Sequence, residues 1–176
     1  MDRFTEINPE ELDENVFRCL GREWMLIAAG TEADGNAMTA SWGGFGFLWN
    51  RPVATVYVRP ERHTADLLAV HGSFSLNFFA ERYRPALQYC GSHSGRDGDK
   101  LAACNLEPFP VADGRCIAVR EARLVIVCRT LYAQRMEEAL FLEPDINQFY
   151  GEKGTAHTMY IGAIERIFRA TGPAGV

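Results

Sequence analysis

Residues 24–42 have the sequence WMLIAAGTEADGNAMTASW, and they contain the clearest fold signal in the chain. Two short apolar runs, residues 24–29 and 37–42, lie on either side of a polar segment, residues 32–36. This segment contains Asp34-Gly35, a dipeptide that favours a tight turn between antiparallel strands. The pattern therefore predicts a β-hairpin.

The rest of the chain continues in the same style, with short strands and short helices. Strands are predicted at residues 52–58, 73–79, 117–136 and 159–168 from their content of β-branched and apolar residues. In the longest of these, residues 122–129 alternate so that one face is drier than the other. The glycine-rich residues 43–47 are expected to interrupt regular structure.

Helix signals are shorter than the strand signals. Asn8 and Pro9 predict the start of a helix over residues 9–19. Thr64 is the expected N-cap of a helix that ends before Gly72. Residues 81–90 and 100–104 are expected to add two further helical segments.

This order of elements predicts one mainly β domain, residues 1–176, built as an antiparallel barrel or closed sheet with short helices. Regular βαβ alternation is missing. Gly44-Phe45-Gly46 lacks the third glycine of the dinucleotide-binding fingerprint, and no Walker A motif is present. These features argue against a Rossmann domain, and no motif indicates a P-loop domain.

Composition limits the function classes. The 176 residues are 47% hydrophobic and carry a net charge of −5, which argues against a general binder of nucleic acid or anionic membranes. The acidic start does not resemble a signal peptide, and no apolar run approaches the roughly 20 residues of a spanning helix. A cytoplasmic protein is expected. The five cysteines and four histidines show no metal-ligand spacing, so no metal site is expected.

Two segments carry side chains suited to an anionic ligand. Thr39 and Ser41 share one face of the predicted strand, where two hydroxyls can contact a ligand. The alternative is an ordinary strand with outward hydroxyls. Arg59 and Arg62 precede a predicted helix N-terminus, a position that favours a phosphate. The alternative is a solvated loop whose arginines pair with neighbouring acids.

A third segment, residues 91–100, combines glycine, hydroxyl and basic residues in the sequence GSHSGRDGDK. Such a loop can present backbone N–H groups and Arg96 to an anion. The alternative is a surface loop without a ligand.

Together these segments resemble the flavin reductase and flavoredoxin-like family. The resemblance rests on NAMTASW at residues 36–42, residues 52–64, FSLN at residues 74–77, and SGRD at residues 94–97 with Lys100. It continues through FYG at residues 149–151 and HTMYIG at residues 157–162. The family implies an FMN-binding split β-barrel, antiparallel and Greek-key-like, and a homodimer with FMN near the subunit interface.

The resemblance also assigns site residues. The family implies cofactor contacts from three parts of the chain: the first strand with Asn36, Met38, Thr39, Ala40, Ser41 and Trp42; the phosphate region with Arg59, Arg62 and Thr64; and the flanking residues Asn77, Phe78, Ser94, Gly95, Arg96 and Lys100. His157 is the candidate for docking a nicotinamide near the ring. Trp42, Phe45 or Tyr150 is expected to supply an aromatic wall.

The implied activity is hydride transfer from NADH or NADPH, as a transient co-substrate, to flavin N5, followed by transfer of electrons to a second acceptor, a small molecule or a protein. A rival reading is an FMN-containing electron-transfer protein that does not react with a nicotinamide. A third is a barrel that has lost its cofactor and serves as a binding module.

Overall fold

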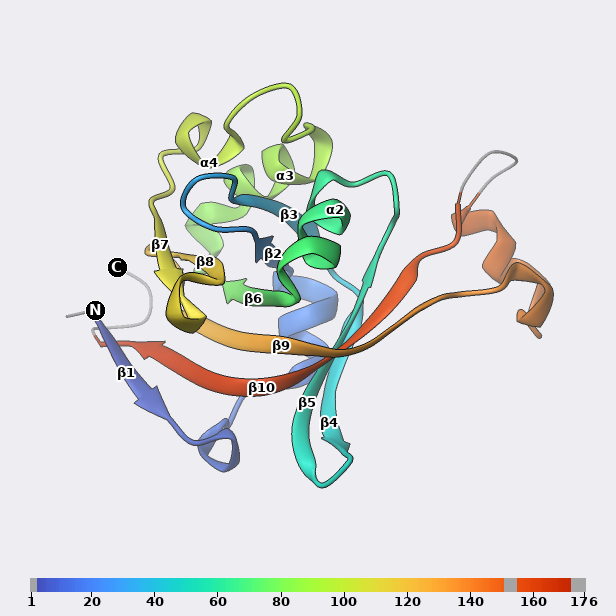
Figure 1. Cartoon of the computed structure of the whole chain (residues 1–176), viewed down its shortest axis with the longest axis horizontal. Helices are drawn as coiled ribbons and strands as arrows, with labels where there is room; N and C mark the ends of the chain where they lie inside the picture. Colours follow the sequence, from blue (N-terminus) through green and yellow to red (C-terminus); the bar gives the residue numbers. More distant parts are fainter. Residues whose placement is uncertain (1–2, 151–154, 172–176) are drawn as a thin grey trace.

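The computed structural model describes residues 3–150 and 155–171 and is mainly β, as the sequence predicts (Figure 1). One antiparallel sheet has the strand order β3-β2-β6-β9-β10-β5-β4, with β1 also paired to β10. Its strands are β1 (Phe4–Ile7), β2 (Met25–Ala29), β3 (Asn36–Ala40), β4 (Gly43–Leu48), β5 (Arg51–Val58), β6 (Ser73–Phe78), β9 (Leu124–Arg135) and β10 (Thr158–Ala170). A second sheet pairs β7 (Pro108–Val111) with β8 (Cys116–Val119).

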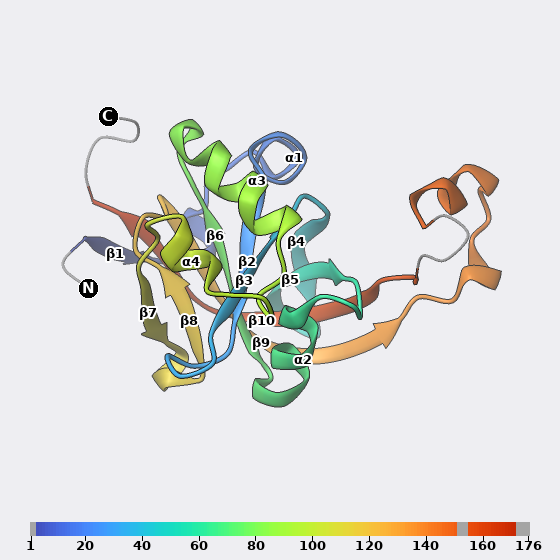
Figure 2. The same ribbon diagram turned by 90° about the horizontal axis from the view of Figure 1, so that it is seen from above.

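The helices are short and lie around the sheet (Figures 1 and 2). They are α1 (Val16–Arg18), α2 (His63–His71), α3 (Arg84–Ser92) and α4 (Lys100–Ala103), with 3₁₀ turns at Pro9–Glu11, Glu81–Tyr83, Ala112–Gly114, Glu138–Leu140 and Pro144–Phe149. Between β9 and β10, the segment with the last two turns projects from the body of the molecule (Figure 2). Among the described residues, no helix has the length and apolar character needed to cross a membrane.

The predicted hairpin is confirmed by the pairing of β2 with β3, in which Met25 lies opposite Ala40 and Ala29 opposite Asn36. The glycine-rich residues were expected to interrupt regular structure, and this expectation is wrong. They form β4, which pairs with β5 through a two-residue loop. Both loop residues, Trp49 (φ 50°) and Asn50 (φ 59°), are left-handed, as a tight hairpin with primed turn geometry requires.

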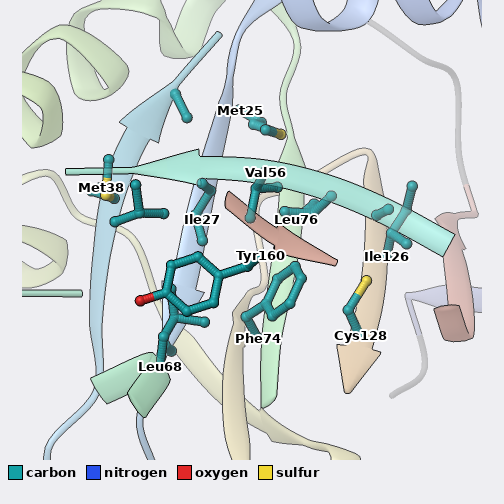
Figure 3. Packing of buried hydrophobic residues seen from close by; sticks show 14 of the residues in the cluster. Met25, Ile27, Met38, Val56, Leu68, Phe74, Leu76, Ile126, Cys128 and Tyr160 are labelled. Carbon is teal, nitrogen blue, oxygen red and sulfur yellow. The ribbon is translucent and has the colours of Figure 1, made fainter. Parts of the chain in front are cut away.

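The sheet separates two apolar cores. Figure 3 shows the first, in which Ile27, Phe74 and Ile126 from three adjacent strands pack with Tyr160 of β10. The second core lies on the opposite face, beneath α3, α4 and the β7–β8 sheet, and contains Val125 and Val127 of β9. The prediction of one drier face for residues 122–129 is therefore wrong, because both faces of β9 are covered.

The predicted strand over residues 117–136 is divided in two. β8 ends at Val119, and the backbone N–H of Ala122 donates to the Val119 carbonyl in a turn before β9 begins. Arg123 then forms ion pairs of 2.6 Å with both Glu14 and Glu23. This half-buried arginine therefore connects the turn between β8 and β9 to the N-terminal segment.

The N-terminal helix predicted over residues 9–19 is wrong in extent. Asn8 and Glu11 form a capping box around one 3₁₀ turn, and Leu12 is already extended. Asn15 then caps α1 by accepting from the Arg18 N–H at 3.0 Å, and a π-helical turn, Cys19–Glu23, follows. The segment therefore contains two separately capped helical turns, one after Asn8 and one after Asn15, instead of one continuous helix.

Helix α2 ends as predicted, because Gly72 takes the left-handed C-cap conformation with φ 61°. Its start differs from the prediction. Arg62 occupies the N-cap, and Thr64 lies inside the helix, fully buried. The Thr64 hydroxyl accepts a 2.8 Å hydrogen bond from the Asn36 side-chain amide. The residue thus joins α2 to β3 instead of capping the helix.

Gly162 of β10 offers a test of packing between strands. A Cβ at this position would lie 2.7 Å from Phe74 Cζ and 2.9 Å from Cys128 Cβ, in the first core. We expect Gly162→Ala to lower the free energy of unfolding by about 1–3 kcal/mol, because the core must shift to admit the methyl group. Urea unfolding checks this. Gly46→Ala is the control, since a Cβ there meets nothing within 4 Å; equal stabilities for the two variants would contradict the packing.

Candidate functional site

Two adjoining cavities form one groove along β3. The larger has a volume of about 470 Å³, and the smaller about 150 Å³. Met38, Arg59 and Arg62 line both, so the cavities are continuous. The larger cavity is also lined by Asn36, Glu61, His63, Thr64, Ser92, His93, Ser94, Gly95, Lys100 and Thr155, and the smaller by Thr39, Ala40, Ser41, Trp42, Tyr57 and His157.

The larger cavity forms the basic end of the groove. Within the described residues, its three cations, Arg59, Arg62 and Lys100, form no ion pair. Arg62 Nη1 donates to the Gly91 carbonyl at 2.7 Å, and Lys100 Nζ donates to the Cys90 carbonyl at 3.1 Å. These carbonyls belong to the last turn of α3, where backbone acceptors lack partners within the helix. The helix end therefore fixes both cations with neutral groups.

Lys100 is unusually buried for a lysine, with 5% of its surface exposed. This burial lowers the pKa of the Lys100 ammonium, and the nearby Arg62 charge also contributes. A bound anion would offset both effects. Glu61, the one carboxylate lining this cavity among the described residues, accepts a hydrogen bond from the Thr155 side chain, which lowers its pKa. Three cations thus face a single carboxylate.

The loop containing Ser94 and Gly95 packs tightly against β3. A Cβ at Gly95 would lie 2.1 Å from Asn36 Oδ1, so only glycine permits this approach. Arg96 does not line the groove. It donates to Asp66 Oδ2 in the first turn of α2 at 2.5 Å and to the Glu61 carbonyl, just before this helix, at 2.9 Å. The loop is therefore held over the groove by Arg96, while Ser94 and Gly95 line it.

The smaller cavity forms the aromatic end. The ring centroids of Trp42 and His157 lie 5.0 Å apart, and the Trp42 and Phe149 rings meet edge to face at 5.5 Å. Tyr150 Oη lies 3.1 Å from His157 Nδ1. Arg59 Nη2 donates to the Phe149 carbonyl at 2.6 Å. These contacts bring the segment before β10 onto the groove.

His157 is 8% exposed, and its pKa is lowered to about 4, first by burial and then by the charge of Arg59. The imidazole is therefore neutral at pH 7. The ring contacts Trp42 and Tyr150 and lines the smaller cavity, and among the described residues its Nε2 makes no hydrogen bond.

Besides Arg96, three residues expected at the cofactor use their side chains elsewhere. Asn77 and Phe78 are fully buried in β6 and do not line the groove. Asn77 accepts from the Val119 N–H at 2.8 Å and donates to the Leu26 carbonyl at 3.2 Å. The Thr39 hydroxyl donates to the Leu87 carbonyl, although the residue still lines the smaller cavity.

The groove also contains residues that the sequence analysis did not select as site residues. They are Tyr57, Glu61, His63, Ser92, His93 and Thr155. Alternation along β5 could have indicated Tyr57, and three of the others, Glu61, His63 and His93, lie directly beside selected residues in the sequence. No local sequence pattern predicts that Tyr150 contacts His157. Gly151 of the FYG motif lies outside the described residues.

The structure is thus a mainly antiparallel β protein with a groove along β3 that has a basic end and an aromatic end. Residues 17–174 match the family model described as a flavin reductase like domain. The chain belongs to this family. Among curated protein sequences, none matches this chain.

Solved structures share the fold. An FMN-binding domain of a flavin reductases-like enzyme from Shewanella baltica has a TM-score of 0.68 and 18% identity, covering 94% of this chain and 76% of that one. Flavoredoxin from Methanosarcina acetivorans has a TM-score of 0.67 and 22% sequence identity, and the match covers 84% of this chain and 68% of that one. Flavoredoxin from Desulfovibrio vulgaris has a TM-score of 0.65 and 18% sequence identity, and the match covers 94% of each chain. The fold class is thus confirmed.

The lowered pKa of His157 gives a pH-dependent stability. Because the unperturbed value is 6.5 and the folded value is about 4, the unfolded chain binds a proton first as the pH falls. We expect the free energy of unfolding to fall by about 1–2 kcal/mol between pH 7 and pH 5 through this group.

Urea unfolding of His157→Gln at the two pH values checks this, because the variant lacks the titrating ring. His93→Gln, which removes an exposed histidine, is the control. An equal pH dependence for wild type and His157→Gln would contradict the neutral buried state.

Proposed function

We propose that this protein binds FMN in the groove and acts as an NAD(P)H-dependent flavin reductase. When bound, FMN would supply a hydride acceptor at N5 for NADH or NADPH and would allow the electrons to pass to a second acceptor. The observation that carries the proposal is the basic end, where Arg59, Arg62 and Lys100 are fixed by neutral contacts and have no carboxylate partner among the described residues. The family membership supports the flavin-related oxidoreductase class.

The residues present fit FMN at both ends of the groove. A phosphate at the basic end can accept charge-assisted hydrogen bonds from the guanidinium and ammonium groups. The Ser94 hydroxyl, which accepts from the Arg96 N–H, can add a donor there, whereas the Ser92 hydroxyl already donates to the Gln88 carbonyl. At the aromatic end, Trp42, Tyr57 and His157 border a space for one side of a flat ring system. Met38 lies between the two ends.

The two arginines serve the chemistry as well as binding. Arg59 and Arg62 line both cavities, so their positive charge acts on the ring as well as on the phosphate. Fixed positive charge stabilises a ring that becomes negative when it is reduced. The neutral imidazole of His157 adds a hydrogen-bonding group without adding a competing charge. Its role in this proposal is to orient the nicotinamide at the ring edge.

A second copy of the chain completes the site in this proposal. The smaller cavity, about 150 Å³, falls below the 300–1,000 Å³ typical of ligand pockets, so one chain encloses the ring only in part. The β4–β5 hairpin also exposes Phe47 and Trp49, by 71% and 53%. Apolar side chains of this size on a hairpin tip favour burial against another surface. A homodimer with the flavin near the interface accounts for both features.

Substitution of both arginines tests the phosphate end. We expect Arg59→Ala/Arg62→Ala to weaken FMN binding, since the phosphate loses charge-assisted donors of about 1.5–3 kcal/mol each. Titration of the flavin-free protein by calorimetry measures the change. Arg166→Ala/Arg169→Ala removes the same charge from exposed ion pairs with Glu6 and Asp13, outside the groove. Equal loss of affinity in both double variants would contradict a phosphate site at the basic end.

A second candidate is an FMN-containing electron carrier, favoured by the structural similarity to two flavoredoxins. Anaerobic mixing of the FMN-loaded protein with NADH and then NADPH separates the two. We expect rapid bleaching of the flavin absorbance by at least one nucleotide, because the ring lies at an open groove. A flavin that neither nucleotide reduces would indicate a carrier, and a chain that retains no FMN would favour a binding module without cofactor.

A further inference from the structure

An apolar cleft adjoins the aromatic end of the groove. Its volume is about 610 Å³, which lies within the usual range for small-ligand sites. Phe17, Leu20, Phe45 and Gly44 are among its lining residues. It shares Ser41 and Trp42 with the smaller cavity, so the two spaces are contiguous.

The lining of this cleft is uncharged. None of the described residues that border it is acidic or basic, in contrast to the basic end of the groove. An anion that enters such a cleft loses hydration and gains no partner charge. The cleft therefore favours an uncharged apolar molecule over a second flavin, whose phosphate carries negative charge.

The cleft also offers one hydrogen-bond donor. Within the described residues, the Ser41 hydroxyl makes no hydrogen bond, so it is free to donate to a ligand carbonyl oxygen. The backbone at Gly44 is bare, because a Cβ at this position would meet nothing within 4 Å. A flat molecule can approach a strand closely at such a position.

We infer that this cleft binds the electron acceptor, and that the acceptor is an uncharged, flat, conjugated carbonyl compound of the quinone type. The inference rests on the proposed function. A quinone bound there takes up a hydride, which is two electrons and one proton, from the reduced flavin, and it takes a second proton from solvent. The product is the hydroquinone, and the oxidised flavin is reduced again by the nicotinamide nucleotide.

Strand β4 supplies a matched pair of variants. Gly44 and Gly46 lie on the same strand two residues apart, and a Cβ at either position meets nothing within 4 Å. Only Gly44 borders the cleft. Gly44→Val therefore adds a side chain at the border of the cleft, on a Cβ position that has open space, whereas Gly46→Val adds the same side chain away from it.

The test is calorimetric titration of the flavin-free protein with 2-methyl-1,4-naphthoquinone and with its sulfonated, negatively charged analogue. We expect wild type and Gly46→Val to bind the neutral quinone with equal affinity. Gly44→Val should bind it about tenfold more weakly or worse, and the sulfonated analogue should bind wild type more weakly by a similar factor.

Equal affinity of Gly44→Val and wild type for the neutral quinone would overturn the inference, as would tight binding of the sulfonated analogue. Sedimentation is measured in parallel. A dimeric wild type with a monomeric Gly44→Val would identify the cleft as a subunit contact and overturn the inference as well.

FMN titration and reduction by NADH and NADPH are run separately on wild type. Quinone binding without FMN binding would overturn the proposed function and leave the cleft as a binding site. FMN binding and reduction without quinone binding would overturn only the acceptor inference.

Discussion

The last turn of α3 is the constraint on which the groove depends. Its carbonyls at Cys90 and Gly91 have no partners within the helix, and they accept hydrogen bonds from Lys100 and Arg62. A carboxylate in the same place would neutralise these cations, whereas a carbonyl fixes them and leaves their charge intact. An ammonium has three donors and a guanidinium five, so most of their donors remain for a ligand. The positive end of the groove thus follows from where one helix stops.

The position of α3 depends in turn on the sheet beneath it. Leu87 and Cys90 of α3 are buried in the second core against Leu26 of β2 and Val125 of β9. The Thr39 hydroxyl adds a hydrogen bond to the Leu87 carbonyl. Close contact at Gly91, where a Cβ would lie 3.3 Å from Thr39 Cβ, fixes the distance between α3 and β3. Packing of an apolar helix face therefore places the polar end of the helix at the groove.

Much of this fold could be predicted from the sequence because its signals are local. The Asp34-Gly35 turn, the apolar strand runs and the helix stop at Gly72 all depend on neighbouring residues. Arg59 and Arg62 were identified for the same reason, since they precede a helix start. The extent of the N-terminal helix could not be predicted in this way. Asn15 caps a new helical turn, and Glu14 forms an ion pair with Arg123, a residue more than 100 positions away in the sequence.

The direction of side chains in the site was the part that local signals could not supply. Asn77 and Ser94 were both selected as cofactor contacts, but only Ser94 lines the groove. Asn77 lies on the central strand β6, where its side-chain amide is buried and forms hydrogen bonds with the backbone of Val119 and Leu26. Arg96 looks suited to an anion in the sequence, but the nearest charge in space is Asp66 of α2. Strand order and loop approach decide these outcomes, and neither is encoded within a few residues.

Arg59 links the two ends of the groove electrostatically. It lines both cavities, donates to the Phe149 carbonyl, and after burial its charge is the largest cause of the lowered pKa of His157. Arg62 acts on His157 in the same direction. An anion at the basic end offsets part of this positive field, so the pKa of His157 rises when that end is occupied. The protonation of the aromatic end therefore responds to occupancy of the basic end, through fixed charges and without a change of fold.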